Sequence, residues 1–361
     1  MKKYKEKQNR KKSADLASNK KKRIILSCFF IVLAILTIFA VTFGNDSFSF
    51  KEFVRFLRDA NHIYIVFAFF TVILYILFEG LAIRSIASSL GYKKRVRDSF
   101  VYSSADIYFS AITPSASGGQ PMTAYFMYKD KIPGSIIAIT LLYNLMMYSL
   151  AFLVIGIVTF IINPAMYLGL NLISKILIFM GFVVQTVIFI GFYFLLYKDQ
   201  LLEKLCSFFI GLGVKIHIVK KPDKYLKKIH NVMEEYQEYA ITLKEKKGIW
   251  FKALIFNILQ RAATIGIALF VFLATYGNPS NLFSIWATQV YVAAGSFCVP
   301  IPGGMGVADY IMLDGYNNIM EFTRSANLQL LSRSISFYCC IIICGIIVLV
   351  KYILARKVKE V

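Results

Sequence analysis

Charged residues are scarce in this sequence, and their scarcity decides the class of protein. Only 17% of the 361 residues are Asp, Glu, Lys or Arg, whereas a soluble globular domain carries about 25%. Hydrophobic residues make up 58%, and the mean hydropathy is +0.62. The apolar residues form long runs that are almost free of charge, which is typical of membrane-spanning helices. The sequence therefore excludes an ordinary soluble domain and predicts an all-α integral membrane protein.

Histidine and cysteine are also sparse, with three His and six Cys in the whole chain. No HExxH-like spacing and no paired metal-binding cysteine motif is present. Five of the six cysteines lie inside apolar runs, where Cys behaves as a small hydrophobic residue. We therefore expect no metal site, no cofactor and no catalytic pair of nucleophile and base.

Basic residues outnumber acidic ones by 41 to 20, which gives a net charge of +21. They gather beside the apolar runs, in segments 2–23, 93–97, 198–247 and at the C-terminus. Cytoplasmic loops of membrane proteins collect Lys and Arg in this way, and such segments attract anionic lipid headgroups. No basic face with interleaved aromatic residues exists elsewhere, so we expect membrane lipids, anionic ones above all, as partners and no nucleic acid.

The apolar runs predict about six full transmembrane helices, at 24–43, 63–83, 134–162, 172–197, 249–275 and 327–350. Residues 1–23 form a basic cytoplasmic tail, and 24–361 form one polytopic domain of the cell membrane. Both termini are then cytoplasmic, and every basic cluster lies inside. The polar segment 198–247 has apolar residues at helical spacing, which predicts an amphipathic helix on the cytoplasmic surface or packed beneath the bundle.

Two apolar segments are interrupted by Gly and Pro. Segment 100–128 contains Thr-Pro-Ser-Ala-Ser-Gly-Gly-Gln-Pro at 113–121, and segment 283–319 contains Val-Pro-Ile-Pro-Gly-Gly-Met-Gly at 299–306. Each is predicted to be a re-entrant hairpin. If each were instead two spans, both termini would still be inside, but the arms around 114–121 are too short at about 1.5 Å per residue.

The two hairpins occupy matching places in two repeat units of opposite orientation, 63–162 and 249–350. Paired interruptions of this kind indicate the binding site of a transporter. Helix N-termini after Gly119 and Gly306 would direct unpaired N–H groups towards a phosphate. The alternative interpretation is that the two Gly/Pro-rich segments are only tight turns between core helices, with no role in binding.

Charges inside the membrane need an explanation, because each costs at least about 2.5–3.5 kcal/mol at the bilayer centre. Arg261 and Arg333 could bind a lipid phosphate, or each could form a structural bridge with a buried Asp. Asp309 could also act only as a first-turn acid that complements a helix dipole. Glu79, near the cytoplasmic end of its span, is expected to snorkel or pair.

The predicted headgroup site combines the two hairpins with these two arginines. Its members are Thr113, Ser115, Ser117, Gly118, Gly119 and Gln120 from the first hairpin, Pro302, Gly303, Gly304, Gly306 and Asp309 from the second, and Arg261 and Arg333 from the spans.

The segments 113–121 and 302–309 (Pro-Gly-Gly-Met-Gly-Val-Ala-Asp) resemble the two signature segments of the lysylphosphatidylglycerol synthase transmembrane, or flippase-like, family. The resemblance extends from Ile24 to about Lys351 and implies movement of phospholipid-type or polyprenyl-type lipids across the bilayer. In the bifunctional synthases this region is joined to a C-terminal aminoacyltransferase domain, which we expect to be absent here. The family often has Glu where this chain has Gln120 and Asp309, and these departures bear on headgroup preference.

Three functions remain open at this point. The chain could be a lipid flippase, the membrane component of an aminoacyl-phospholipid synthase, or a non-transporting lipid-binding subunit that needs a partner chain. A homo-oligomer or a separate partner enzyme is compatible with each. The paired hairpins favour the flippase.

Overall fold

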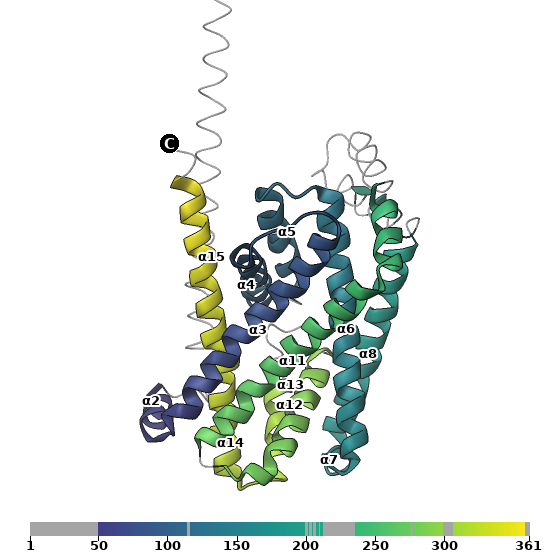
Figure 1. The fold of residues 1–361 in the computed structure, drawn as a ribbon. Helices are drawn as coiled ribbons and strands as arrows, with labels where there is room; N and C mark the ends of the chain where they lie inside the picture. Colours follow the sequence, from purple (N-terminus) through teal and green to yellow (C-terminus); the bar gives the residue numbers. More distant parts are fainter. Residues whose placement is uncertain are drawn as a thin grey trace, which may run out of the picture. The chain divides into compact units, whose positions relative to one another are not determined.

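The computed structural model describes residues 50–113, 116–198, 235–275, 277–298 and 306–357, with isolated positions between 201 and 211. The chain divides into two compact units, Met1–Glu52 and Phe53–Val361, and the account below concerns the second. All regular secondary structure in the described part of the chain is helical (Figure 1).

The first half of the unit contains the elements up to the polar segment. After α2 (Phe50–Asp59) come α3 (His62–Ser89), α4 (Val96–Ile112), α5 (Gly119–Lys129), α6 (Gly134–Ile162), α7 (Pro164–Leu168) and α8 (Leu172–Tyr197). The second half contains α11 (Lys247–Ala274), the 3-10 turn η2 (Pro279–Asn281), α12 (Leu282–Ser296), α13 (Val307–Asn317), α14 (Phe322–Arg333), the π-helical segment η4 (Ser334–Cys339) and α15 (Cys340–Lys357).

Five helical stretches in the described residues are long and apolar enough to cross a membrane: His62–Ser89, Gly134–Ile162, Leu172–Tyr197, Lys247–Ala274 and Arg324–Leu354. They confirm five of the predicted spans, and the predicted span 24–43 lies outside the described residues. The last span differs in detail from the predicted continuous helix. Directly after Arg333 the helix widens into π-helix η4, a distortion that is common at functional sites.

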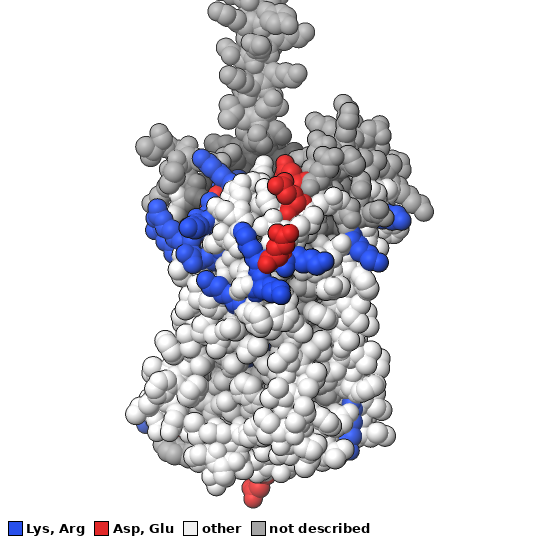
Figure 2. Space-filling model, turned by 45° about the vertical axis from the view of Figure 1, so that its right-hand side comes forward, with Lys and Arg blue, Asp and Glu red and all other residues white. Residues whose placement is uncertain are grey.

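Side chains on the outside of the bundle are apolar, as a membrane surface requires. On α8 alone Leu172, Ile176, Phe179, Val187 and Phe194 are all exposed, whereas soluble monomers seldom expose apolar patches above a few hundred Å². Figure 2 shows a broad belt without charge between the two ends of the described surface. This is the surface of a multi-pass membrane protein.

One end of the unit collects the loops rich in Lys and Arg, and we call it the basic end. Exposed basic residues in these loops include Lys93, Arg95, Arg97, Lys129, Lys131, Lys244, Lys246 and Lys247, and Figure 2 shows Lys and Arg gathered at this end. Lys94 Nζ donates to Asp130 O at 2.6 Å, and Lys246 Nζ donates to Ser89 O at 2.8 Å. Lys351 of α15 pairs with Asp98 and Asp130 at 3.3 and 3.5 Å. These contacts hold both outer ends of the α4–α5 hairpin at the basic end.

The opposite end joins loops from both halves of the chain. Asn61 N donates to Ala274 O at 3.0 Å, and Arg324 Nη2 donates to Thr275 O at 3.1 Å. Asn171 donates to the Asp314 carboxylate from its side chain at 2.7 Å and from its backbone at 3.0 Å. The α12–α13 hairpin therefore begins and ends at this end, which is the reverse of α4–α5.

Close packing between α3 and its neighbours sets the position of the polar residues described below. A Cβ on Gly80 of α3 would lie 2.7 Å from Ser99 O of α4, so only glycine permits this approach. Ser103 Oγ of α4 donates to Ile76 O of α3 at 2.8 Å. Helix α11 packs along α3 on another side (Figure 1), so α3 lies between two chain-distant helices.

Residues 235–245 are helical and come from the segment predicted to be amphipathic. Tyr236 and Leu243 are each 1% exposed, and Ser135 Oγ of α6 donates to Glu235 Oε2 at 2.6 Å. This part of the segment therefore packs against the bundle through its apolar face.

The two ends should be accessible from opposite sides of the membrane. In a background without native cysteines, Lys131→Cys at the basic end and Asn278→Cys at the other end both place a thiol at an exposed position. We expect an impermeant maleimide added to intact cells to label Asn278→Cys and to spare Lys131→Cys until the cells are opened, because basic loops are cytoplasmic. Labelling of both from outside would contradict this topology.

Candidate functional site

The turn of the first hairpin is closed by Thr113. Its hydroxyl donates to Phe109 O at 2.6 Å and accepts from Gly118 N at 2.8 Å. The hydroxyl predicted to bind a phosphate is therefore used to connect the end of α4 to the start of α5. This satisfies backbone groups that would otherwise be unpaired at a helix terminus.

Gly119 begins α5 and lies directly against α4. A Cβ here would overlap Ser110 Oγ and Asp106 Oδ1 and would lie 2.7 Å from Asp106 O. The next residue, Gln120, donates from Nε2 to Asp106 Oδ2 at 2.9 Å. Gly119 thus permits close packing of α5 against α4, and this packing brings Gln120 within hydrogen-bonding distance of the Asp106 carboxylate.

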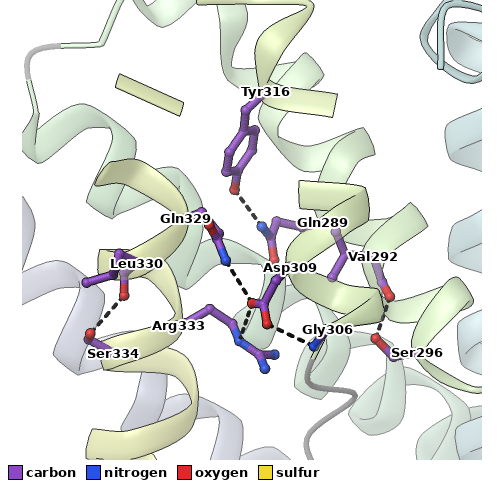
Figure 3. A network of polar contacts seen from close by, with 10 residues as sticks. All are labelled: Gln289, Val292, Ser296, Gly306, Asp309, Tyr316, Gln329, Leu330, Arg333 and Ser334. Atoms are coloured by element: carbon purple, nitrogen blue, oxygen red, sulfur yellow. Dashed lines mark hydrogen bonds and ion pairs between the residues drawn. The ribbon is translucent and has the colours of Figure 1, made fainter. Parts of the chain in front are cut away.

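In the second hairpin Asp309 is the centre of a polar network (Figure 3). Its Oδ2 accepts from Gly306 N at 3.0 Å, which caps the start of α13. Its Oδ1 accepts from Gln329 Nε2 at 2.8 Å and pairs with Arg333 Nε at 3.2 Å. Gly306 has φ +83°, a conformation that favours glycine. Asp309 therefore joins the α13 terminus to α14, and the structure contains an ion pair between Arg333 and this Asp, whose side chain is 22% exposed.

Arg261 and Arg333 line one cavity of about 160 Å³, although they come from α11 and α14. The remaining wall is mixed, with Phe152, Ile155, Thr264, Ile265, Gln289, Val292, Ala293 and Ser296. Gln289 Nε2 donates to Tyr316 OH at 2.5 Å (Figure 3). The structure therefore brings together two arginines that are distant in the sequence.

Arg261 differs from Arg333 in its partners. Its Nε and Nη2 atoms are buried and have no hydrogen-bond acceptor among the described residues. The guanidinium carbon lies 3.6 Å from the centre of the Tyr148 ring and 5.3 Å from that of Phe152. Aromatic faces attract the cation but provide no acceptor for Nε and Nη2, and buried donors without acceptors are costly. Arg261 is therefore a cation in the cavity wall whose hydrogen-bonding capacity is only partly used.

A second cavity of about 330 Å³ adjoins the first, because Ile155 lines both. Its other walls are Val154, Val158, Thr159, Ile162, Ile258, Phe283 and Trp286. Thr159 Oγ1 accepts from Trp286 Nε1 at 3.1 Å, so the polar atoms of these two residues are occupied. An almost wholly apolar groove between α6, α11 and α12 thus lies beside the arginine cavity.

In a comparison with known families, residues 24–344 match the family described as "Lysylphosphatidylglycerol synthase TM region". The chain belongs to this family. The match confirms the resemblance of the two Gly/Pro-rich segments and supports a membrane-lipid-related role. No curated protein and no solved structure matches the chain.

This family member assembles only part of the predicted headgroup site in its described residues. Ser115, Pro302, Gly303 and Gly304 lie outside the described residues. Ser117, Gly118, Gly119 and Gln120 lie at the turn of α4–α5, and Gly306 and Asp309 lie at the start of α13. Neither group lines the arginine cavity.

Sequence reasoning missed two buried polar residues of this family member. Glu79 is 5% exposed and does not reach the surface, and Gln260 is 1% exposed. Gln260 Nε2 donates to Glu79 Oε2 at 3.3 Å. The sequence does show Glu79 as a single acidic residue inside the apolar run 63–83. It does not show the partner Gln260, which lies far away in the sequence.

Gly119→Ala tests the packing of the first hairpin. Because the new Cβ would overlap α4 atoms, we expect a loss of about 1–3 kcal/mol of stability, the cost of overpacking. Gly134→Ala is the control, since no atom lies within 4 Å of a Cβ there. Unfolding of the detergent-solubilised protein measures both, and equal stability of the two variants would contradict the packing role.

The Asp309–Arg333 bridge predicts energetic coupling between the two side chains. Asp309→Asn and Arg333→Gln should each destabilise the protein. The double variant should lose less than the sum of the two by about 0.5–3 kcal/mol, because both single variants break the same contact. Strictly additive losses would show that the 3.2 Å contact contributes nothing to stability.

Proposed function

We propose that this protein is a flippase that moves a phosphate-bearing lipid, of phospholipid or polyprenyl type, across the cell membrane. The observation that carries the proposal is the arginine cavity, whose wall includes Arg261, a cation with two buried donor nitrogens that have no acceptor among the described residues. Phosphate oxygens suit a guanidinium because two parallel hydrogen bonds can form.

The size of the cavity supports a headgroup as its ligand. At about 160 Å³ it is smaller than pockets that enclose whole small molecules, which measure about 300–1,000 Å³. A phosphate group with a few neighbouring atoms fits this scale, and the rest of the lipid must then lie elsewhere.

The adjoining apolar groove supports a lipid over a free anion. It shares Ile155 with the arginine cavity and has apolar walls. A hydrocarbon chain gains about 0.8 kcal/mol for each CH₂ that it buries. A lipid would therefore place its phosphate at Arg261 and a chain in the groove.

The two oppositely oriented hairpin units support a transport mechanism. α4–α5 begins and ends at the basic end, and α12–α13 begins and ends at the other. In the proposal both hairpins are re-entrant, the basic end is cytoplasmic, and the repeats rock about the cavity so that it opens to each side in turn.

Transport by reconstituted protein tests the proposal. Proteoliposomes carry fluorescent phosphatidylglycerol, phosphatidylethanolamine or a phosphate-free glycolipid, and a membrane-impermeant quencher reports the exposed fraction. We expect the phosphate-bearing lipids to move and the glycolipid to stay. Arg261→Gln should weaken binding of phosphatidylglycerol by about 1.5–3 kcal/mol, the range for a charged hydrogen bond, or about ten- to a hundred-fold.

The control is Arg97→Gln, which removes a positive charge from an exposed position at the basic end and should leave transport intact. Binding without movement would support the lipid-binding subunit instead. Formation of aminoacyl lipid from charged tRNA by the purified chain would support the synthase. Equal transport by Arg261→Gln and the unmodified protein would remove the arginine cavity from the mechanism.

A further inference from the structure

Two carboxyl groups meet inside the bundle, away from the cavity walls. The carboxyl groups of Glu79 of α3 and Asp106 of α4 lie close enough to interact directly. Each also accepts from a glutamine: Glu79 from Gln260 of α11 at 3.3 Å and Asp106 from Gln120 of α5 at 2.9 Å. An ionised carboxylate only accepts hydrogen bonds. The contact between the two carboxyl groups therefore needs a proton on one of them.

The surroundings contain too little positive charge for both acids to be ionised. No ion pair within 4 Å joins Glu79 or Asp106 to a described basic residue. The titratable groups around the pair come from each helix packed against it: Tyr75 of α3, Tyr148 of α6, Arg261 of α11, and Cys340 and Cys344 of α15. Arg261 is the only cation among them, and its charge acts on Glu79. Two adjacent buried carboxylates cannot both ionise against one positive charge.

Two buried oxygen atoms near the pair lack a hydrogen-bond donor in the described part of the chain, so a further proton on a carboxyl group could be accommodated there. Asp106 Oδ1 and Gln260 Oε1 are buried without a donor among the described residues, and Gln260 is 1% exposed. With one proton, the pair has a charge of −1 that balances Arg261. With a second proton the pair is neutral, and a new O–H donor becomes available to these acceptors.

Arg261 connects this pair to the arginine cavity, because the same guanidinium lines that cavity. An anion bound there neutralises Arg261, and the remaining negative charge on the pair then has no cation to balance it. A second proton becomes favourable at that moment. By thermodynamic linkage, binding of the proton must raise the affinity for the anion by the same factor as the anion raises the affinity for the proton.

We propose that Glu79 and Asp106 form a proton-binding pair linked through Arg261 to the arginine cavity, so that binding of a phosphate group is accompanied by uptake of one proton. The proposal rests on the proposed function in one respect, that the cavity binds the phosphate of a lipid. One proton passes from solvent to a carboxylate oxygen and forms an O–H bond; no other bond forms or breaks. The transported lipid would thereby carry a proton with it.

A proton suits the pair better than a metal cation. Gln120 and Gln260 both direct amide NH₂ groups at the carboxylates, which occupies oxygens that a metal would need and places positive hydrogens beside it. The described residues contain no group of three or more His, Cys, Asp or Glu that could hold a metal ion.

Calorimetry of headgroup binding tests the inference directly. Dihexanoyl phosphatidylglycerol is titrated into the purified full chain at one pH in several non-phosphate buffers of different ionisation enthalpy. The dependence of the observed heat on buffer gives the number of protons taken up. We expect about one proton for each lipid bound, and an affinity that falls by up to about tenfold per pH unit as the pH rises.

The double variant Glu79→Gln/Asp106→Asn should bind the same lipid with no proton uptake and with an affinity independent of pH, because neither side chain can then bind a proton. Each single variant keeps one carboxylate to balance Arg261 and should still take up about one proton. Asp98→Asn is the control, since this carboxylate pairs with Lys351 at the basic end and should leave uptake at one proton.

The outcomes separate the two proposals. Binding without proton uptake in the unmodified protein would overturn the proton pair and leave the anion cavity intact. Affinity that depends on Na⁺ and not on pH would overturn it in favour of a sodium site. Absence of any phosphatidylglycerol binding would contradict the proposed function and, with it, the proposal that the proton pair is linked to headgroup binding.

Discussion

Backbone N–H and C=O groups that water does not reach must find partners inside the protein, and the architecture of a membrane protein depends on this constraint. The turns of the two hairpins illustrate it. Thr113 connects the two arms of α4–α5 through its hydroxyl, and Asp309 caps α13 while binding α14. Glycines at 119 and 306 serve the same purpose, one by close approach and one by a positive φ. The residues of the two Gly/Pro-rich motifs thus provide hydrogen-bond partners for the backbone at the hairpin turns and allow the close packing there.

Within this framework the two arginines have different positions. Arg333 is tied to Asp309, and the helix widens into π-helix directly after it. Arg261 is stacked on aromatic rings and has two donor nitrogens without acceptors among the described residues. The cavity is therefore lined by one arginine that has a carboxylate partner and by one that has none in the described part of the chain.

Much of the fold could be predicted because the signal is local. Length and hydropathy alone located five of the spans, and the two Gly/Pro interruptions located the hairpin turns. The contacts of the site could not be predicted in this way. Gln260 reaches Glu79 across 181 residues, and Asn171 reaches Asp314 across 143. Neither apolar periodicity nor motif spacing carries information about such pairs, so Glu79 was expected to snorkel or pair near the surface.

The sequence by itself determined that this is an all-helical membrane protein of the lysylphosphatidylglycerol synthase transmembrane family. The burial of apolar runs and the cost of charge in lipid depend on the composition of each segment alone. The sequence is therefore enough to predict the class and the spans. Only the tertiary structure decided which charges are paired. Electrostatic interactions depend on distances of a few ångströms between residues far apart in the sequence, and packing of α3 between α4 and α11 sets those distances.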